Sequence, residues 1–408
     1  MGLYEQHRFQ NAETAELLLI DIARRLQLPD WKHDKAVVSY EALCAHVDRP
    51  GSPLHNLVDI CYPSGSFGIG TVVASRVRQN QHDLDVVIEL LLSADTPPAV
   101  VLGLLYMAIR GEPGSRYYDK TTLNSRCVTV EYEDRFTVDL MPIVRDGSNI
   151  ARRGSLFHYK AGEGAYRKPV NPFGFKSYYN ATVDADPAFV RAFRALDEKV
   201  VAKALVEPME TPVRLEEKSA RTVSIQLLKR RRDVRHRKAD RKGQRCVPSV
   251  VLAAWALAKP EPRPTLLWEL HEQATFIKTQ LAIASATGQL VDVYNPVWPG
   301  VDRFTDRWPS SHLEQRALHD DMADLTTKLE VLASNALSPT AAKAVLEELF
   351  GETAATYAVD EMMKRHAEAS QAGALKFGVT GAVLSGATAA SSTRAALRSS
   401  TDFGGRAD

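Results

Sequence analysis

The stretch YPSGSFGIGTVVASRVRQNQHDLDVVIEL, Tyr62–Leu90, decides the fold, because a glycine-rich turn here precedes an apolar strand that carries two aspartates. In the turn, glycines such as Gly65 let the backbone approach a phosphate closely, and Ser66 adds a hydroxyl. Asp83 and Asp85 are two residues apart, so on a strand their side chains point to the same face. Two unpaired carboxylates on a buried strand would cost several kcal/mol. The pattern therefore predicts a cation site beside a phosphate-binding turn.

A third carboxylate interrupts a second apolar strand, FTVDLMPIV, at Asp139. If the two strands are neighbours, Asp139 meets the first pair and completes a cluster for two metal ions. Such a cluster holds its ions roughly 3.5–4 Å apart and stabilises the attacking and leaving oxygens of phosphoryl transfer. The alternative is that all three aspartates sit at strand ends and face water.

Composition excludes several other classes of protein. The chain has 408 residues, of which 45% are hydrophobic and 25% are charged, and its formal net charge is +1. No overall field attracts nucleic acid or an anionic membrane, and the four cysteines form no CxxC pair for structural zinc. The polar start predicts no signal peptide, and no apolar run reaches about 18 residues. We expect a soluble, cytoplasmic protein without membrane contact.

The pattern of elements predicts an α+β fold with three parts. Residues 1–180 mix helices and strands, residues 181–370 are mostly helical, and residues 371–408 form an Ala/Ser/Gly-rich flexible tail. We expect a surface connection over 146–180. The expected strands are 57–61, 83–92 and the hairpin 126–132/135–144, and the expected helices are 12–28, 71–78, 97–110, 187–204, 220–236, 248–257, 264–287, 311–337 and one that Ser338-Pro339 begins.

The segments GSFGIGT, HDLDVVIEL and FTVDLMPIV, in this order, resemble the nucleotidyltransferase signature of the polymerase-β superfamily. Within the superfamily, the chain is most similar to the bacterial cGAS/DncV-like nucleotidyltransferases (CD-NTases) of anti-phage signalling. RTVSIQLLKRRRD, Arg221–Asp233, is similar to the family's helix with a phosphate-contacting lysine. NPVWPGVDRFTDRW, Asn295–Trp308, is similar to its Asn-Pro…Trp segment. The resemblance covers about residues 1–335.

The resemblance implies an active site in a cleft between a mixed-sheet lobe, with an N-terminal spine helix, and a helical C-terminal lobe. It also implies two Mg²⁺ ions, for which Mn²⁺ could substitute, and a role for Asp139 in deprotonating a ribose hydroxyl. The positions that it assigns are Gly65, Ser66, Lys229 and Ser249 for the triphosphate and Asp83, Asp85 and Asp139 for the metal ions.

The implied function is the joining of NTPs, ATP expected among them, into a cyclic di- or trinucleotide second messenger. One alternative is nucleotidyl transfer to an RNA end or to a small-molecule hydroxyl. Another is a scaffold that only binds nucleotide or nucleic acid. The family often has an aromatic residue after the serine of CVPSVVLAAW, whereas this chain has Val250. Base recognition then falls to another aromatic residue, for which the candidates are Phe175, Tyr178, Tyr179 and Trp255.

Two further segments suggest partners. The run Lys229–Arg245 holds ten Lys/Arg and two Asp, which is typical either of a nucleic-acid groove or of a solvated helix end and loop. Animal relatives in the superfamily are activated by double-stranded nucleic acid. In some CD-NTases a ubiquitin-like ligase joins the C-terminus covalently to another molecule, and the tail of this chain would permit that.

Overall fold

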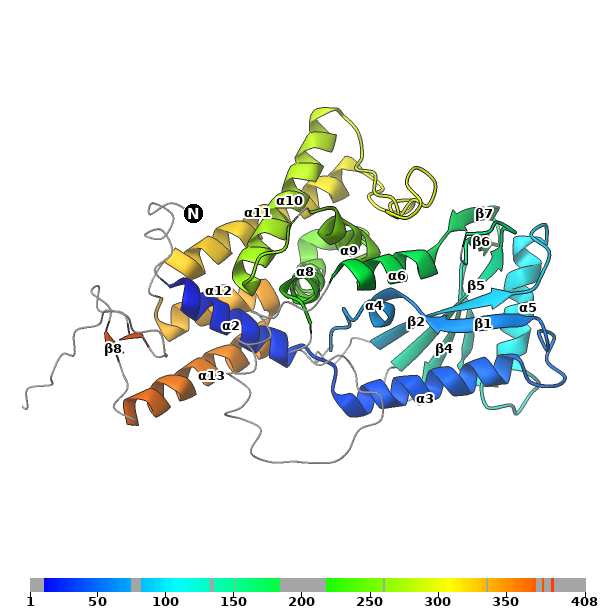
Figure 1. Cartoon of the computed structure of the whole chain (residues 1–408), viewed down its shortest axis with the longest axis horizontal. Helices are drawn as coiled ribbons and strands as arrows, with labels where there is room; N and C mark the ends of the chain where they lie inside the picture. Colours follow the sequence, from blue (N-terminus) through cyan, green and yellow to red (C-terminus); the bar gives the residue numbers. More distant parts are fainter. Residues whose placement is uncertain are drawn as a thin grey trace, which may run out of the picture.

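The computed structural model has a sheet part and a helical part, and the helix α6 (Pro172–Thr182) lies at their junction (Figure 1). None of the helices in the described part of the chain is both long and apolar enough to cross a bilayer. The residues that the structure describes are 11–74, 82–132, 136–150, 152–183, 218–259, 261–334, 337–371, 376–377 and 383–384.

The sheet has seven strands, and its central pair is parallel. The strand order is β1-β2-β5-β4-β3, with β6 on the far end of β5 and β7 beside β6. β2 and β5 run parallel, whereas β1 and β4 flank them antiparallel. The strands are β1 (Val58–Pro63), β2 (His82–Leu90), β3 (Thr121–Leu123), β4 (Val128–Tyr132), β5 (Phe136–Arg145), β6 (Gly154–Lys160) and β7 (Gly164–Val170).

Alternation along the central strands gives the sheet two different faces. Leu84, Val86 and Ile88 of β2 are buried in a core with α3 (Asp30–Val47) and α5 (Pro98–Arg110). The intervening residues of β2 point the other way, and Figure 1 shows the helical part on that side of the strands. We call this second surface the cleft face. Asp83 and Asp85 belong to it because they alternate with the residues of the apolar core.

The helical part has its own, larger core, and α2 (Ala12–Arg25) packs into it. Its members come from widely separated stretches of sequence. The side chain of Ser338 caps α12 by accepting a hydrogen bond from the Ala341 amide at 3.2 Å, as the sequence predicts. The helices are α8 (Ala220–His236), α9 (Ser249–Ala258), α10 (Leu266–Ala286), α11 (His312–Ser334), α12 (Pro339–Phe350) and α13 (Glu352–Gln371).

The α+β fold, the antiparallel hairpin β4–β5 and the helices around 12–28, 97–110, 220–236, 248–257, 264–287 and 311–337 are confirmed, with ends shifted by a few residues. Two expectations are wrong. Of the expected helix 71–78, residues 71–74 are not helical and residues 75–78 lie outside the described residues, while the short helix α4 (Gly65–Gly68) lies in the turn itself. The stretch 146–180 is not the surface connection that we expected, because it forms β6, β7 and α6. The sequence analysis also missed α3. The expected helix 187–204 and nearly all of the tail lie outside the described residues.

Candidate active site

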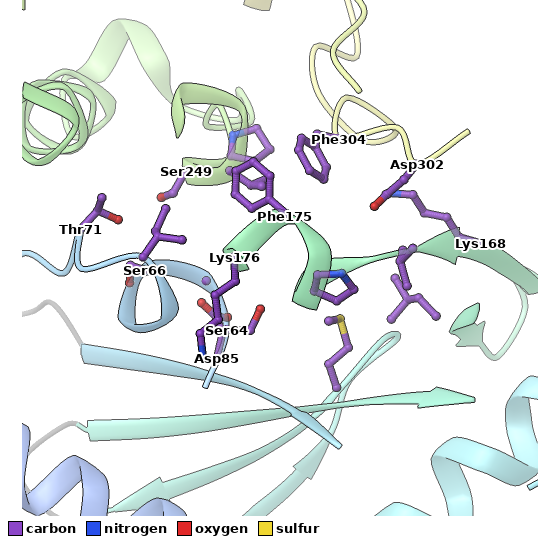
Figure 2. A pocket seen from close by; sticks show the side chains of 18 residues that line it. Ser64, Ser66, Thr71, Asp85, Lys168, Phe175, Lys176, Ser249, Asp302 and Phe304 are labelled. Atoms are coloured by element: carbon purple, nitrogen blue, oxygen red, sulfur yellow. The ribbon is translucent and has the colours of Figure 1, made fainter. Parts of the chain in front are cut away.

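A cavity of about 430 Å³ lies between the cleft face of the sheet and the helical part (Figure 2). One end is polar and is lined by the turn that follows β1 and by Asp85. The other end is lined by Phe304, Lys168 and Asp302, from β7 and from the loop before α11. Side chains of α6 and of the first turn of α9 complete the wall.

The turn fits against β2 only because residue 65 is glycine. The φ angle of Gly65 is +51°, in the left-handed region, and a Cβ atom there would lie 2.0 Å from Asp85 Oδ2. The Ser64 amide donates to the Asp85 carbonyl oxygen at 2.8 Å, and the Thr71 amide donates to the Ser66 carbonyl oxygen at 2.9 Å. These bonds hold the hydroxyl-bearing residues Ser64, Ser66 and Thr71 at the wall of the cavity that Asp85 also lines.

The strand register brings the predicted aspartates to neighbouring positions. Asp85 on β2 pairs with Asp139 on β5, and Asp83 pairs with Thr137, so all of them belong to the cleft face. The Thr137 hydroxyl donates to Asp83, and the Thr129 hydroxyl donates to Asp139. The three carboxylates therefore occupy adjacent positions, and the hydroxyls orient two of them.

Their electrostatics are unfavourable in the absence of a cation. The Asp85 side chain is exposed to the open cavity but has protein packed around it on the other sides. Burial, and then the negative charges of Asp139 and Asp83, raise its pKa to about 6. Burial also raises the pKa of Asp139, with a further contribution from Asp83, against the hydrogen bond from Thr129. Crowded oxygen donors of this kind suit hard divalent cations. Within the described residues, however, no three His, Cys, Asp or Glu side chains stand close enough to ligate one ion together.

Lys229 lies behind the cavity wall. It is buried on α8, and its Nζ donates to the Thr71 carbonyl oxygen at 2.7 Å. Burial, and then the charge of Arg232, lower its pKa to about 7. Thr71 lines the cavity and Lys229 does not, so Lys229 supports the end of the turn from behind.

Ser249 is the first residue of α9 and lines the cavity together with Val250. Its hydroxyl accepts a hydrogen bond from Arg232 Nη1 at 3.0 Å. Of the predicted site residues, four line the cavity, namely Gly65, Ser66, Asp85 and Ser249; two more, Asp83 and Asp139, flank Asp85 on the sheet; and Lys229 contacts the wall from outside.

The four aromatic candidates separate clearly. Phe175 lines the cavity and packs edge-on against Phe304, with ring centroids 5.1 Å apart. Tyr179 and Trp255 are buried in the core of the helical part, and Tyr178 is exposed without lining the cavity. Phe175 and Phe304 thus form the aromatic surface of this cavity. Phe175 was among the candidates expected from the sequence, and Phe304 was not.

Sequence reasoning also missed Lys168, Lys176 and Asp302, which line the cavity. Both lysines lie in the stretch that we expected to be a connection, so nothing drew attention to them. Asp302 and Phe304 lie inside the Asn-Pro…Trp segment, where a family resemblance was evident but no single position stood out.

The basic run is largely engaged within the molecule. Arg230 and Arg231 are buried and donate to the Phe350 and Glu348 carbonyl oxygens, at 2.7 and 2.6 Å. Arg235 and Arg241 donate to Asp321, at 2.8 and 2.6 Å. A solvated helix end is therefore the wrong interpretation for the first half of the run. A nucleic-acid groove would have to compete with these internal bonds.

The mixed sheet, the aspartates on adjacent parallel strands and the turn above them define a nucleotidyltransferase of the polymerase-β fold. The chain is 33% identical over 363 residues to the cyclic dinucleotide synthase CdnG of Bradyrhizobium diazoefficiens. This match covers 87% of this chain and 84% of that protein. No family model matches the sequence. The chain belongs to the CD-NTase family, and it is a nucleotidyltransferase of the cyclic dinucleotide synthase class, as its motifs predict.

Solved structures agree with this assignment. The structure of Bradyrhizobium diazoefficiens CdnG in complex with GTP superposes with a TM-score of 0.72 at 30% identity, over 86% of this chain and 99% of that chain. The structure of CdnC from E. coli MS115-1 with ATP has a TM-score of 0.54 at 16% identity, over 82% and 96% of the two chains. The second likeness concerns the fold alone.

Proposed function

We propose that this chain joins two NTPs, GTP among them, into a cyclic dinucleotide second messenger in the cytoplasm, as part of anti-phage signalling. The single observation that carries the proposal is the parallel register of β2 and β5, which sets Asp85 beside Asp139 under the turn at Gly65. The similar CdnG has been solved with GTP, which supports a guanine nucleotide as one substrate.

In each of two rounds, a ribose hydroxyl oxygen of one nucleotide bonds to the α-phosphorus of the other. The bond from that phosphorus to the β-phosphate oxygen breaks, and pyrophosphate leaves. The hydroxyl proton passes to a carboxylate, for which Asp139 is the candidate. The second round closes the linear product.

The turn and the cavity wall would hold the donor triphosphate. Gly65 lets the backbone approach closely, and the hydroxyls of Ser66 and Ser249 line the same space. Lys176 adds a cation, whose Nζ is 3.4 Å from the Pro63 carbonyl oxygen and whose pKa burial lowers. Lys229 would act through Thr71, by fixing the end of the turn.

Asp83, Asp85 and Asp139 would hold the divalent cations that the family uses. The crowding of like charges at these positions fits such ions, because an unpaired cluster is costly. When bound, Mg²⁺ or Mn²⁺ would polarise the attacking hydroxyl and neutralise the leaving pyrophosphate.

The test compares the wild-type chain with the Asp83→Asn/Asp85→Asn double variant. Each is incubated with labelled GTP and ATP and with Mg²⁺, and then with phosphatase. The wild type should give a small phosphatase-resistant product, and the double variant should give none while unfolding at an unchanged or higher temperature. Asp95→Asn, in the exposed turn after β2, is the matched control and should keep full activity. NTP consumption by the double variant at the wild-type rate would contradict the proposal, as would label transferred to a macromolecule.

A further inference from the structure

Asp302 presents an unused hydrogen-bond acceptor at the cavity end that lies away from the phosphate-binding turn. Its side chain is buried, with 2% of its surface exposed. Its Oδ2 accepts from the Asn171 amide and from Asn295 Nδ2, both at 2.9 Å. Its Oδ1 has no hydrogen-bond partner among the described residues. Figure 2 shows the carboxylate pointing toward the cavity beside Phe304.

The nearest cation does not satisfy this oxygen. Lys168 Nζ lies 3.9 Å from Asp302 Oδ1, beyond hydrogen-bond distance, and donates to the Arg303 carbonyl oxygen. The same Nζ lies 3.5 Å from Asp306, so its charge is shared. The two bonds to Oδ2 prevent the carboxylate from turning away, and an unpaired buried acceptor is costly. A hydrogen-bond donor on a bound ligand would satisfy the unpaired Asp302 Oδ1.

The surroundings of Asp302 suit a nucleobase. Phe175 and Phe304 form an aromatic corner, and Val250 adds apolar surface. The hydroxyls of the turn and the Asp85 carboxylate lie at the opposite end of the cavity (Figure 2). A nucleotide with its phosphates at the turn would therefore place its base near Asp302.

A carboxylate selects among bases because it only accepts hydrogen bonds. Guanine presents two adjacent donors on its Watson–Crick edge, the N1–H and the 2-amino group. Adenine presents an acceptor, N1, at the corresponding position. We infer that Asp302 selects guanine over adenine for one of the two nucleotides, by accepting hydrogen bonds from this edge. The inference rests on the proposed function, since it concerns a base in the same cavity.

Asp302→Asn tests the inference with little change in shape. The amide oxygen can keep both bonds from Asn171 and Asn295, while the amide nitrogen replaces Oδ1 and presents a donor. Binding of the non-reacting α,β-methylene analogues of GTP, ITP and ATP is measured by calorimetry. For Asp302→Asn, GTP-analogue binding should weaken about tenfold to a hundredfold, as expected for a lost bond to a charged group. ATP-analogue binding should not weaken. In the wild type, the ITP analogue, which lacks the 2-amino group, should bind with intermediate affinity.

Asp306→Asn is the matched control, because Asp306 also neighbours Lys168 but does not line the cavity. It should leave the preference for guanine intact. Equal weakening of the GTP and ATP analogues by Asp302→Asn would overturn the inference, and so would unchanged binding of both. Failure of the proposed function is a separate result, since it appears as the absence of cyclic product from the wild type whatever its base preference.

Discussion

The acidic side chains Asp85 and Glu269, one in each part of the molecule, have pKa values shifted in opposite directions. In the sheet part, Asp85 lies beside other aspartates, and its pKa is raised to about 6. In the helical part, Glu269 is fully buried among hydrogen-bond donors, and its pKa is lowered. The Glu269 side chain is enclosed by protein, whereas that of Asp85 is exposed at the cavity, and the two differ in their hydrogen-bond partners.

Glu269 has four donors around its two oxygens. Arg221 Nε and Lys259 Nζ each lie at 3.0 Å, the Arg263 amide at 2.7 Å and Gln273 Nε2 at 2.8 Å. Burial alone would raise the pKa of Glu269, but these bonds and charges together lower it. The network joins α8, the end of α9 and α10, so its role is structural.

Among the residues that the structure describes, the aspartates of the cleft have no comparable set of donors, apart from one threonine hydroxyl each at Asp83 and Asp139. Negative charge that the protein itself leaves uncompensated is available to a cation and a triphosphate. The comparison teaches that crowded carboxylates facing a cavity indicate a site when their own protein does not neutralise them, and that a buried carboxylate belongs to the scaffold when the protein neutralises it fully.

The largest effect that tests this contrast is on stability. Glu269→Gln should lower the free energy of unfolding by about 3 kcal/mol, because it leaves the charges of Arg221 and Lys259 buried without their counter-charge. Chemical denaturation measures the change. Glu272→Gln is the control, since Glu272 also pairs with Lys259 but is partly exposed, and it should cost less than about 1 kcal/mol.

The Asp83→Asn/Asp85→Asn variant belongs in the same denaturation series. Removing like charges that repel should leave the free energy of unfolding unchanged or higher when EDTA is present. A loss as large as that of Glu269→Gln would mean that the cleft carboxylates are structural too, and the contrast would fail.

Sequence alone predicted the candidate site and the broad fold, because both predictions depend on local patterns. Two aspartates at i and i+2 share a face on any strand, and the apolar residues between them indicate burial. Helices such as α8 and α10 were predicted for the same reason, since their lengths and caps are local.

The rest depends on pairing between distant segments. Strands β6 and β7 mix polar, apolar and glycine residues, and β7 is mostly exposed, so only the pairing of β6 with β5 and of β7 with β6 distinguishes them from a loop. Asp302 attracts attention only when Asn171, far away in sequence, donates to it. Similarly, Lys229 lies behind the turn, at a carbonyl oxygen that no motif could indicate.

A smaller effect tests whether the close approach of Gly65 to Asp85 is needed for activity. Gly65→Ala and Gly70→Ala both place a side chain at a positive φ angle, so each should cost about 1–2 kcal/mol of stability. They should differ in activity. A Cβ at residue 65 enters the space of the Asp85 carboxylate, whereas a Cβ at residue 70 meets no heavy atom within 4 Å. We expect at least about a hundredfold loss of cyclic product formation for Gly65→Ala and little loss for Gly70→Ala. Equal activities would show that the close approach of the turn to Asp85 is dispensable.

The smallest expected effect is the pH dependence of the free energy of unfolding, which should differ in sign between the variants at Glu269 and at Asp83 and Asp85. Glu269 has a lowered pKa, so its stabilisation is present above its ordinary pKa of 4.5 and is lost as the pH falls through the folded-state pKa. The stability deficit of Glu269→Gln should therefore shrink as unfolding is measured from pH 7 down to pH 3.5.

Asp85 has a raised pKa, so its contribution to stability is complete below its ordinary pKa of 3.8 and is lost as the pH rises through about 6. In EDTA, the advantage of the Asp83→Asn/Asp85→Asn variant over the wild type should hence grow across that interval. Parallel trends in the two variants would mean that the carboxylates of both parts of the molecule have the same electrostatic role.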